Sequence, residues 1–199
     1  MQVTIGVMNT PAHMIINMAA LGRGHTVAAQ VAVLVGSVAP DAPMFWFYFV
    51  EKVVRGTPER EIWRDAYFRD SWQSFIDLFN SVPVIVVGLL LCWWLSSRVG
   101  LLFFLSMLLH VLLDLPFHND DAHRHFYPLS DWRFESPLSY WDPRYHGNLV
   151  GVAEIAISVL CMAVVFAYGK TSFSRWSVGL IFAAYAGFYA FAMVMWSGL

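Results

Sequence analysis

The sequence has few charged residues. Asp, Glu, Lys and Arg make up 13% of its 199 residues, whereas 58% are hydrophobic and 17% are aromatic. Soluble domains contain roughly twice that share of charged residues, and one of this length could not bury so much apolar surface. A disordered chain has the opposite bias. The formal net charge of -2 excludes nucleic acid as an expected partner. We therefore expect an integral membrane protein.

Cysteine is scarce as well, since the chain holds only Cys92 and Cys161, each within an apolar stretch. This placement predicts small hydrophobic side chains and excludes a cysteine-based zinc ribbon or redox motif. A basic segment of the kind that opens a secretory signal is also missing, because residues 1–22 carry no charged side chain. We expect the helices of the protein itself to insert into the membrane.

Long stretches with little or no charge predict an all-α fold with four long transmembrane helices, because a bilayer core requires about 20 residues of helix. We place these helices at residues 72–97, 99–116, 147–168 and 175–197. A short N-terminal helical hairpin packed within the bundle precedes them, at residues 11–21 and 26–39. Pro and Gly residues bound both of its helices.

Residues 51–70 mix charged side chains with aromatic ones and favour a helix that lies in the membrane interface. A solvated connecting helix is the alternative. The expected organisation is a single membrane domain, 1–199. Its parts are the hairpin at 1–41, an interfacial segment at 42–70, a helical pair at 71–116, a polar loop at 117–146 and a second helical pair at 147–199.

Basic residues predict the orientation in the membrane. Arg98 lies between the first two long helices, and Lys170 and Arg175 lie between the last two. Because cytoplasmic turns are enriched in Lys and Arg, we expect both turns to face the cytoplasm. The polar loop at 117–146 would then face the non-cytoplasmic side, with a bacterial inner membrane as the expected location.

Four of the seven histidines fall between residues 110 and 125, together with three aspartates. His110 and Asp114 are four residues apart, so they project from one face of a helix and suit two ligands of one metal ion. Ionisable groups in an apolar helix are costly and usually mark a functional site. The cluster predicts a divalent metal site; a hydrogen-bonded pair that only joins helices is the alternative.

Other polar residues are expected at the same membrane level and complete the candidate site. The candidate metal ligands are His13, Asp41, His110, Asp114 and His118. Candidates for acid and base catalysis are Asp121, His123 and His125, because imidazole titrates near neutral pH. Arg124 is the candidate for binding an anionic substrate group, although a solvated loop arginine is the alternative. Asp70 and Glu154 are candidates for orienting the ligands.

Three segments, PAHMIINMAALG, GSVAPDAP and HVLLD, resemble the YdjM-like family of membrane-bound, predicted metal-dependent hydrolases, also described as LexA-binding inner-membrane proteins. The resemblance implies metal or catalytic roles for His13, Asp41, His110 and Asp114. The sequence departs from the family where Ala12 replaces a threonine and where the residues after Asp41 lack a second acid. In addition, FRDSWQSF replaces an Arg-Gly-x-Thr-His segment. A looser similarity to zinc-dependent phospholipases C and related nucleases suggests phosphoester cleavage.

These features predict a metal-dependent hydrolase that acts on a phosphoester or other ester of a membrane lipid or lipid-linked substrate. Mixed histidine and carboxylate ligands suit one or two divalent ions, with Zn²⁺ first and Mn²⁺ or Fe as alternatives. The rival interpretation is a metal or small-molecule transporter in which the same residues form a transit site. A membrane scaffold whose aromatic loop binds a protein is a third, and it leaves the histidine cluster unexplained.

Overall fold

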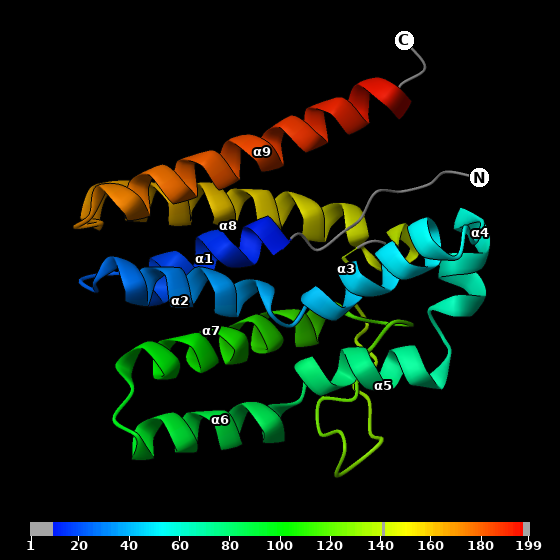
Figure 1. Ribbon diagram of the computed structural model, residues 1–199. Coiled ribbons are helices and arrows are strands. Elements are labelled where there is room, and N and C mark those ends of the chain that lie inside the picture. The colour runs from blue at the N-terminus through cyan, green and yellow to red at the C-terminus, as the bar shows by residue number, and fades with distance from the viewer. Residues whose placement is uncertain (1–9, 141, 197–199) are drawn as a thin grey trace.

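The computed structural model describes residues 10–140 and 142–196, apart from the side chains of 188–196. Every regular element in these ranges is helical (Figure 1). The helices are α1 Thr10–Leu21, α2 Val27–Val38, α3 Ala42–Phe49 with the π-helical turn η1 Val50–Val54, α4 Glu59–Glu61 with the π-helical turn η2 Ile62–Ala66, α5 Asp70–Phe79, α6 Val82–Trp94, α7 Arg98–Asp114 with the 3-10 turn η3 Leu115–Phe117, the 3-10 turn η4 Pro143–Tyr145, α8 Gly147–Tyr168, and α9 Ser172–Trp196.

The short helix α1 lies in the interior of the helical assembly. It contacts α2, α7, α8 and α9, with α8 and α9 on one side and α6 and α7 on the other (Figure 1). Its buried residues include both apolar side chains, such as Ile15 and Met18, and polar ones, such as His13 and Asn17. Because α1 is enclosed by other helices, its polar side chains must find partners inside the protein.

Three helices are long and apolar enough to cross a membrane: Asp70–Trp94, Arg98–Phe117 and Gly147–Tyr168. The pair Val27–Val38 and Ala42–Val54 passes the same test together, with a bend of 56° between its halves. The all-helical, membrane-compatible architecture predicted from the sequence is therefore confirmed. The predicted fourth span, 175–197, falls on α9, whose last side chains lie outside the described residues.

The helix predicted over 72–97 is divided into α5 and α6. Pro83 has no N–H with which to continue the helical hydrogen bonds, so α6 begins anew with Ser81 as its N-cap. Asn80 fills the break, where its side-chain N–H donates to the carbonyl of Pro40 at 3.2 Å. The break in this span is thus joined to the turn between α2 and α3.

The prediction of a single interfacial helix over 51–70 is also wrong in detail. The helix that begins with α3 ends at Val54, a turn follows, and a second helical piece covers 59–66. Gly56 occupies the left-handed region at φ 67°, and Pro58 precedes the second piece. A left-handed residue and a proline two positions later end one helix and start another.

The polar loop between α7 and α8 is held to the rest of the protein by backbone hydrogen bonds. The N–H of Val82, at the start of α6, donates to the carbonyl of His125 at 2.8 Å. Within the loop, the N–H of Ser136 donates to the carbonyl of His118 at 2.9 Å. Figure 1 shows the loop beside α5, at the opposite end of the molecule from the α1–α2, α6–α7 and α8–α9 connections.

Candidate metal centre

Two histidines and one aspartate from separate helices meet at a buried point. Nε2 of His13, on α1, lies 2.9 Å from Oδ1 of Asp114, and Nε2 of His110 lies 2.9 Å from Oδ2 of the same carboxylate. One ligand atom from each residue lies within 4.8 Å of the other two. The two imidazole rings stack with their centroids 3.9 Å apart. This group could hold a metal ion.

The imidazole of His110 is fixed by a backbone group. Its Nδ1 lies 2.7 Å from the carbonyl oxygen of Ser37, and a carbonyl only accepts hydrogen bonds, so Nδ1 carries the hydrogen. In a neutral ring, Nε2 then presents a lone pair. That atom lies 2.9 Å from Asp114 Oδ2 and 3.5 Å from Asp41 Oδ1, yet makes no hydrogen bond. While the ring is neutral, three electron-rich atoms face one another, an arrangement that either a proton on Nε2 or a metal ion would relieve.

Asp41 enters this group from the turn between α2 and α3. The hydroxyl of Thr10 donates to its Oδ2 at 2.5 Å, which leaves Oδ1 toward His110. The Asp41 side chain is 27% exposed, whereas that of Asp114 is 5% exposed. Asp41 is therefore the most exposed of the four side chains at this centre.

A second layer of hydrogen bonds joins the three helices one turn further from the polar loop. Ser106 Oγ donates to the carbonyl of Val33 at 2.6 Å, and the Asn17 side chain donates to both the carbonyl and Oγ of Ser106 at 2.8 Å. Four residues beyond Ser106 and Val33, His110 makes the equivalent bond to Ser37. This ladder fixes α7 on α2 and α1, and with them the distances between the candidate ligands.

His118 lies between two carboxylates at the end of α7. Its Nε2 is 3.8 Å from Asp114 Oδ2, and its Nδ1 is 3.0 Å from Asp121 Oδ2. Burial would lower the pKa of His118, but Asp121 and Asp114 outweigh burial and raise this pKa to about 10 in the metal-free chain. The hydroxyl of Tyr140 donates to the same oxygen of Asp121 at 3.1 Å. His118 is thus protonated near pH 7, and it lies between the candidate centre and the polar loop.

The other two loop histidines, His123 and His125, are also buried and lie beyond His118, on the side away from the candidate centre. The ring of His123 lies 4.9 Å from that of His118, and its Nδ1 is 3.4 Å from Asp77 Oδ1. His125 donates from Nδ1 to the carbonyl of Asn80 at 3.3 Å. Burial, together with the neighbouring His123, lowers the pKa of His125 to about 4. His125 is therefore neutral near pH 7 and joins the loop to the α5–α6 break.

Arg124 makes contacts that sequence reasoning did not foresee. Its Nε donates to Asp77 at 2.5 Å, and its two terminal nitrogens donate to Asp131 and Ser74, each at 2.9 Å. An anionic substrate would have to compete with these partners. Asp77 itself is fully buried and was missed as a site residue, although it is the last acid before the charge-free stretch 78–97.

The two residues predicted to orient the ligands occupy different surroundings. Asp70 is exposed as the first residue of α5, two helical turns before the buried Asp77. Glu154 is buried on α8 and accepts a hydrogen bond of 2.6 Å from the hydroxyl of Tyr185 on α9. Their assignments as orienting residues stay predictions.

No protein-family model, no curated protein and no solved structure matches this chain. The resemblance to the YdjM-like family therefore rests on three short sequence motifs. Those motifs supply His13, Asp41, His110 and Asp114, the four side chains that the structure gathers around one centre.

Proposed function

We propose that this protein is a metal-dependent membrane hydrolase in which His13, His110 and Asp114, assisted by Asp41, hold a divalent cation. One observation carries the proposal. The Ser37 carbonyl fixes the hydrogen of His110 on Nδ1, so the lone pair on Nε2 faces the carboxylates of Asp114 and Asp41. A proton would relieve this repulsion at one atom, whereas a metal ion would satisfy all of these ligands together.

The chemistry of the donor set favours zinc. Two imidazole nitrogens and a carboxylate are a usual three-residue set in catalytic zinc sites, which keep one position open. More oxygen ligands would favour Mn²⁺ or Fe. When bound, such an ion lowers the pKa of a water ligand toward ~7 and polarises the oxygen of the bond to be cleaved. We propose one ion at this centre.

The remaining groups orient ligands and hold protons. The carbonyl of Ser37 keeps Nε2 of His110 free, and the hydroxyl of Thr10 directs one oxygen of Asp41 toward the centre. His118 lies beside Asp114 and carries a proton in the metal-free chain, so it is placed to donate to a leaving group. Asp121, an ionised carboxylate 3.0 Å from Nδ1 of His118, would orient the protonated imidazole from the loop side.

The position of the centre favours a substrate that is a membrane lipid or is linked to one. His110 and Asp114 belong to the last turns of the apolar helix Arg98–Phe117, at the end next to the polar loop. A phosphoester or other ester near the lipid headgroups would meet the centre at that level. Arg98, Lys170 and Arg175 lie toward the opposite end, which favours a non-cytoplasmic site in a bacterial inner membrane.

The rival proposal is transport of a metal or small molecule through the same centre. A transit path requires polar groups across the whole membrane. Along α1, α2 and α7, the apolar side chains of Met18, Val33 and Leu102 separate the ladder of Asn17 and Ser106 from the next buried polar residue of α2, Gln30. This sequence of contacts favours a one-sided site, and hence hydrolysis. Uptake of Zn²⁺ into proteoliposomes that contain the protein would reverse the preference.

Metal analysis of the purified protein tests the proposal. We expect about one equivalent of transition metal in the wild type and almost none in His110→Ala or Asp114→Ala. The control His25→Ala changes a histidine in the turn between α1 and α2 and should keep the full metal content. Equal metal content in all four proteins, or none in the wild type, would rule out the centre. Phosphate release from lipid phosphoesters, lost with a chelator and restored by Zn²⁺, tests the reaction itself.

A further inference from the structure

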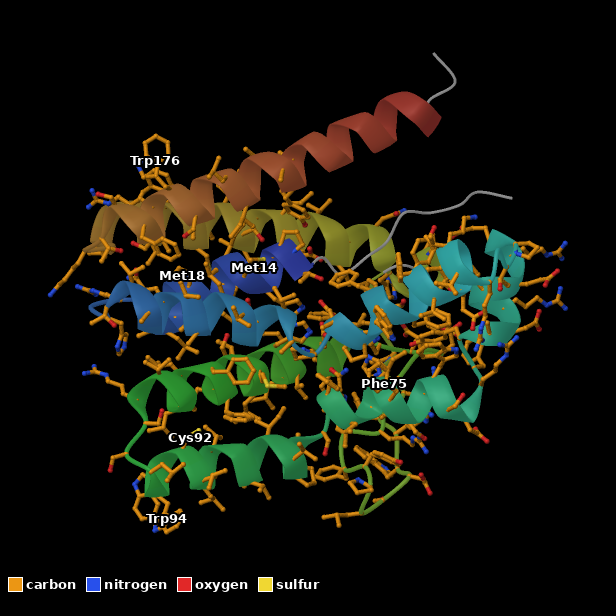
Figure 2. All side chains as sticks on the ribbon, in the orientation of Figure 1. Met14, Met18, Phe75, Cys92, Trp94 and Trp176 are labelled. Carbon is orange, nitrogen blue, oxygen red and sulfur yellow. The ribbon has the colours of Figure 1, made fainter. Side chains whose placement is uncertain are left out.

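A second candidate site lies between α3 and α5, and none of its residues belongs to the metal centre. It is a hollow of about 480 Å³ that is open to the surface, and below it is called the cavity. Figure 2 labels Phe75 on α5, below α3 in that view. The cavity is lined by Trp46, Arg55, Arg69, Ser71, Trp72 and Phe75. Two cations and three aromatic rings thus share one hollow.

A buried carboxylate fixes both arginines. Glu51 is fully buried, and its Oε1 accepts from Nη1 of Arg55 at 2.5 Å, from Nη1 of Arg69 at 3.4 Å and from Nε1 of Trp72 at 2.9 Å. Each guanidinium uses one nitrogen in this way, and its other nitrogens have no partner among the described residues. These three side chains, two guanidiniums and one carboxylate, together carry a charge of +1.

The arginine side chains remain accessible despite this anchoring. Both are 51% exposed, and they lie at the ends of two apolar helices. Arg55 directly follows Ala42–Val54, and Arg69 directly precedes Asp70–Trp94. Helix ends of this kind lie at the level of lipid headgroups, where tryptophan side chains also concentrate. Trp46 and Trp72 line the cavity, and their presence is consistent with a position at the headgroup level.

We propose that this cavity binds the phosphate group of an anionic membrane lipid. The forked donors of Arg55 and Arg69 match the oxygens of a phosphate, and the hydroxyl of Ser71 adds a further donor. Trp46 and Phe75 offer an apolar surface to the first carbons of the lipid chains. The site stands apart from the metal centre, so lipid binding here requires neither a bound metal nor catalysis.

Native mass spectrometry of the full chain in detergent tests this site. The probes are dioleoylphosphatidylglycerol, dioleoylphosphatidylcholine and inorganic phosphate. We expect the wild type to retain one phosphatidylglycerol molecule and to bind phosphatidylcholine and free phosphate at least tenfold more weakly. The double variant R55Q/R69Q should lose at least tenfold in affinity. The matched control R60Q/R64Q removes the same charge from exposed residues of α4 and η2 and should bind as the wild type does.

Loss of both arginines could destabilise the fold by leaving the buried Glu51 without its ion pairs. A second variant therefore tests the site without changing either arginine. Ser71→Trp fills the cavity and leaves every ion pair of Glu51 in place, so it should weaken phosphatidylglycerol binding to the same extent. Equal binding of both lipids, equal losses in R55Q/R69Q and R60Q/R64Q, or unchanged binding in Ser71→Trp would overturn the proposal. Binding of free phosphate as tightly as the lipid would overturn its assignment to a lipid.

Discussion

The hydroxyl of Thr10 donates a hydrogen bond of 2.5 Å to Oδ2 of Asp41, across 31 residues of sequence. Thr10 opens α1, three residues before His13, and Asp41 follows the last turn of α2. The bond joins the starts of two elements that each bring a candidate ligand to the same point. It also orients the other oxygen of Asp41, which lies 3.5 Å from His110 Nε2.

Replacement of Thr10 by valine should therefore weaken metal binding. Valine keeps the shape of threonine and removes the donor, so Asp41 loses the contact that orients it. Changes to residues that orient metal ligands typically cost 10-fold to 100-fold in affinity, and we expect a loss of about 10-fold. Competition with a chromophoric zinc chelator measures it. Thr171→Val, which removes a hydroxyl next to α9, is the control and should bind metal as the wild type does.

Gly36 sets the distance between α2 and α7. A Cβ at this position would lie 2.3 Å from the carbonyl oxygen of Phe103 and 2.9 Å from Cβ of Ser106, so Gly36→Ala must push the helices apart. We expect a loss of about 2 kcal/mol in stability from this overpacking, and weaker metal binding because Ser37 moves from His110. Gly151→Ala on α8 meets nothing within 4 Å and should unfold at the wild-type temperature or slightly above it, because alanine favours the helix. Equal thermal unfolding of the two variants would contradict the close packing.

The long helices could be predicted from the sequence because long apolar stretches indicate segments that are buried in either lipid or protein. The helix predicted over 147–168 ends at Tyr168 as expected, whereas the helix predicted over 99–116 ends at Asp114 and continues as the 3-10 turn η3. Asn80, Ser81 and Pro83, by contrast, mark a break within an apolar stretch that reads as one span by its composition. Composition over a window of 20 residues does not resolve one residue that lacks an N–H.

The candidate site was predictable where its residues lie one helical turn apart, as His110 and Asp114 do. Its supporting contacts were not, because they join residues that only tertiary structure brings together. The Ser37 carbonyl reaches His110 across 73 residues, and Asn17 reaches Ser106 across 89. Arg124 shows the same limit: a sequence shows its charge, and only the fold shows that Asp77 and Asp131 already engage it.

The ion pair of Asp77 and Arg124 should hold the polar loop on α5. The Asp77 side chain is 0% exposed and that of Arg124 is 15% exposed, so Asp77→Asn leaves a largely buried cation with only the exposed Asp131 as an ionised partner. We expect a loss of about 3 kcal/mol in stability and faster tryptic cleavage within residues 117–146. Asp131 bonds to the same arginine but is 85% exposed, so Asp131→Asn should change stability by less than about 1 kcal/mol. Similar effects of the two changes would show that the burial of Asp77 does not matter.

The stability of the metal-free protein should pass through a maximum near pH 6.5, because two histidines titrate in opposite directions. The pKa of His125 is lowered to about 4 by burial and His123, below the ~6.5 of an unfolded histidine. The unfolded chain therefore binds the extra proton first, and stability falls by up to about 3 kcal/mol as the pH drops from 6.5 to 4. The pKa of His118 is raised to about 10 despite its burial, because of Asp121 and Asp114. The stability that its protonation provides is present below pH 6.5 and is lost as the pH rises to 10.

The acid limb of the stability profile, below pH 6.5, depends on His125, and the alkaline limb, above pH 6.5, depends on His118. A separate variant therefore tests each limb. Denaturant unfolding in detergent with a chelator present, measured from pH 4.5 to 9.5, should show a flattened acid limb in His125→Asn and an unchanged alkaline limb. His118→Asn should give the converse, since its proton is bound in both states below pH 6.5. His146→Asn, at an exposed position, should leave both limbs as in the wild type. If His125→Asn kept the full acid limb, the loss of stability would have to come from the carboxylates alone. His125 would then not be held neutral by its surroundings.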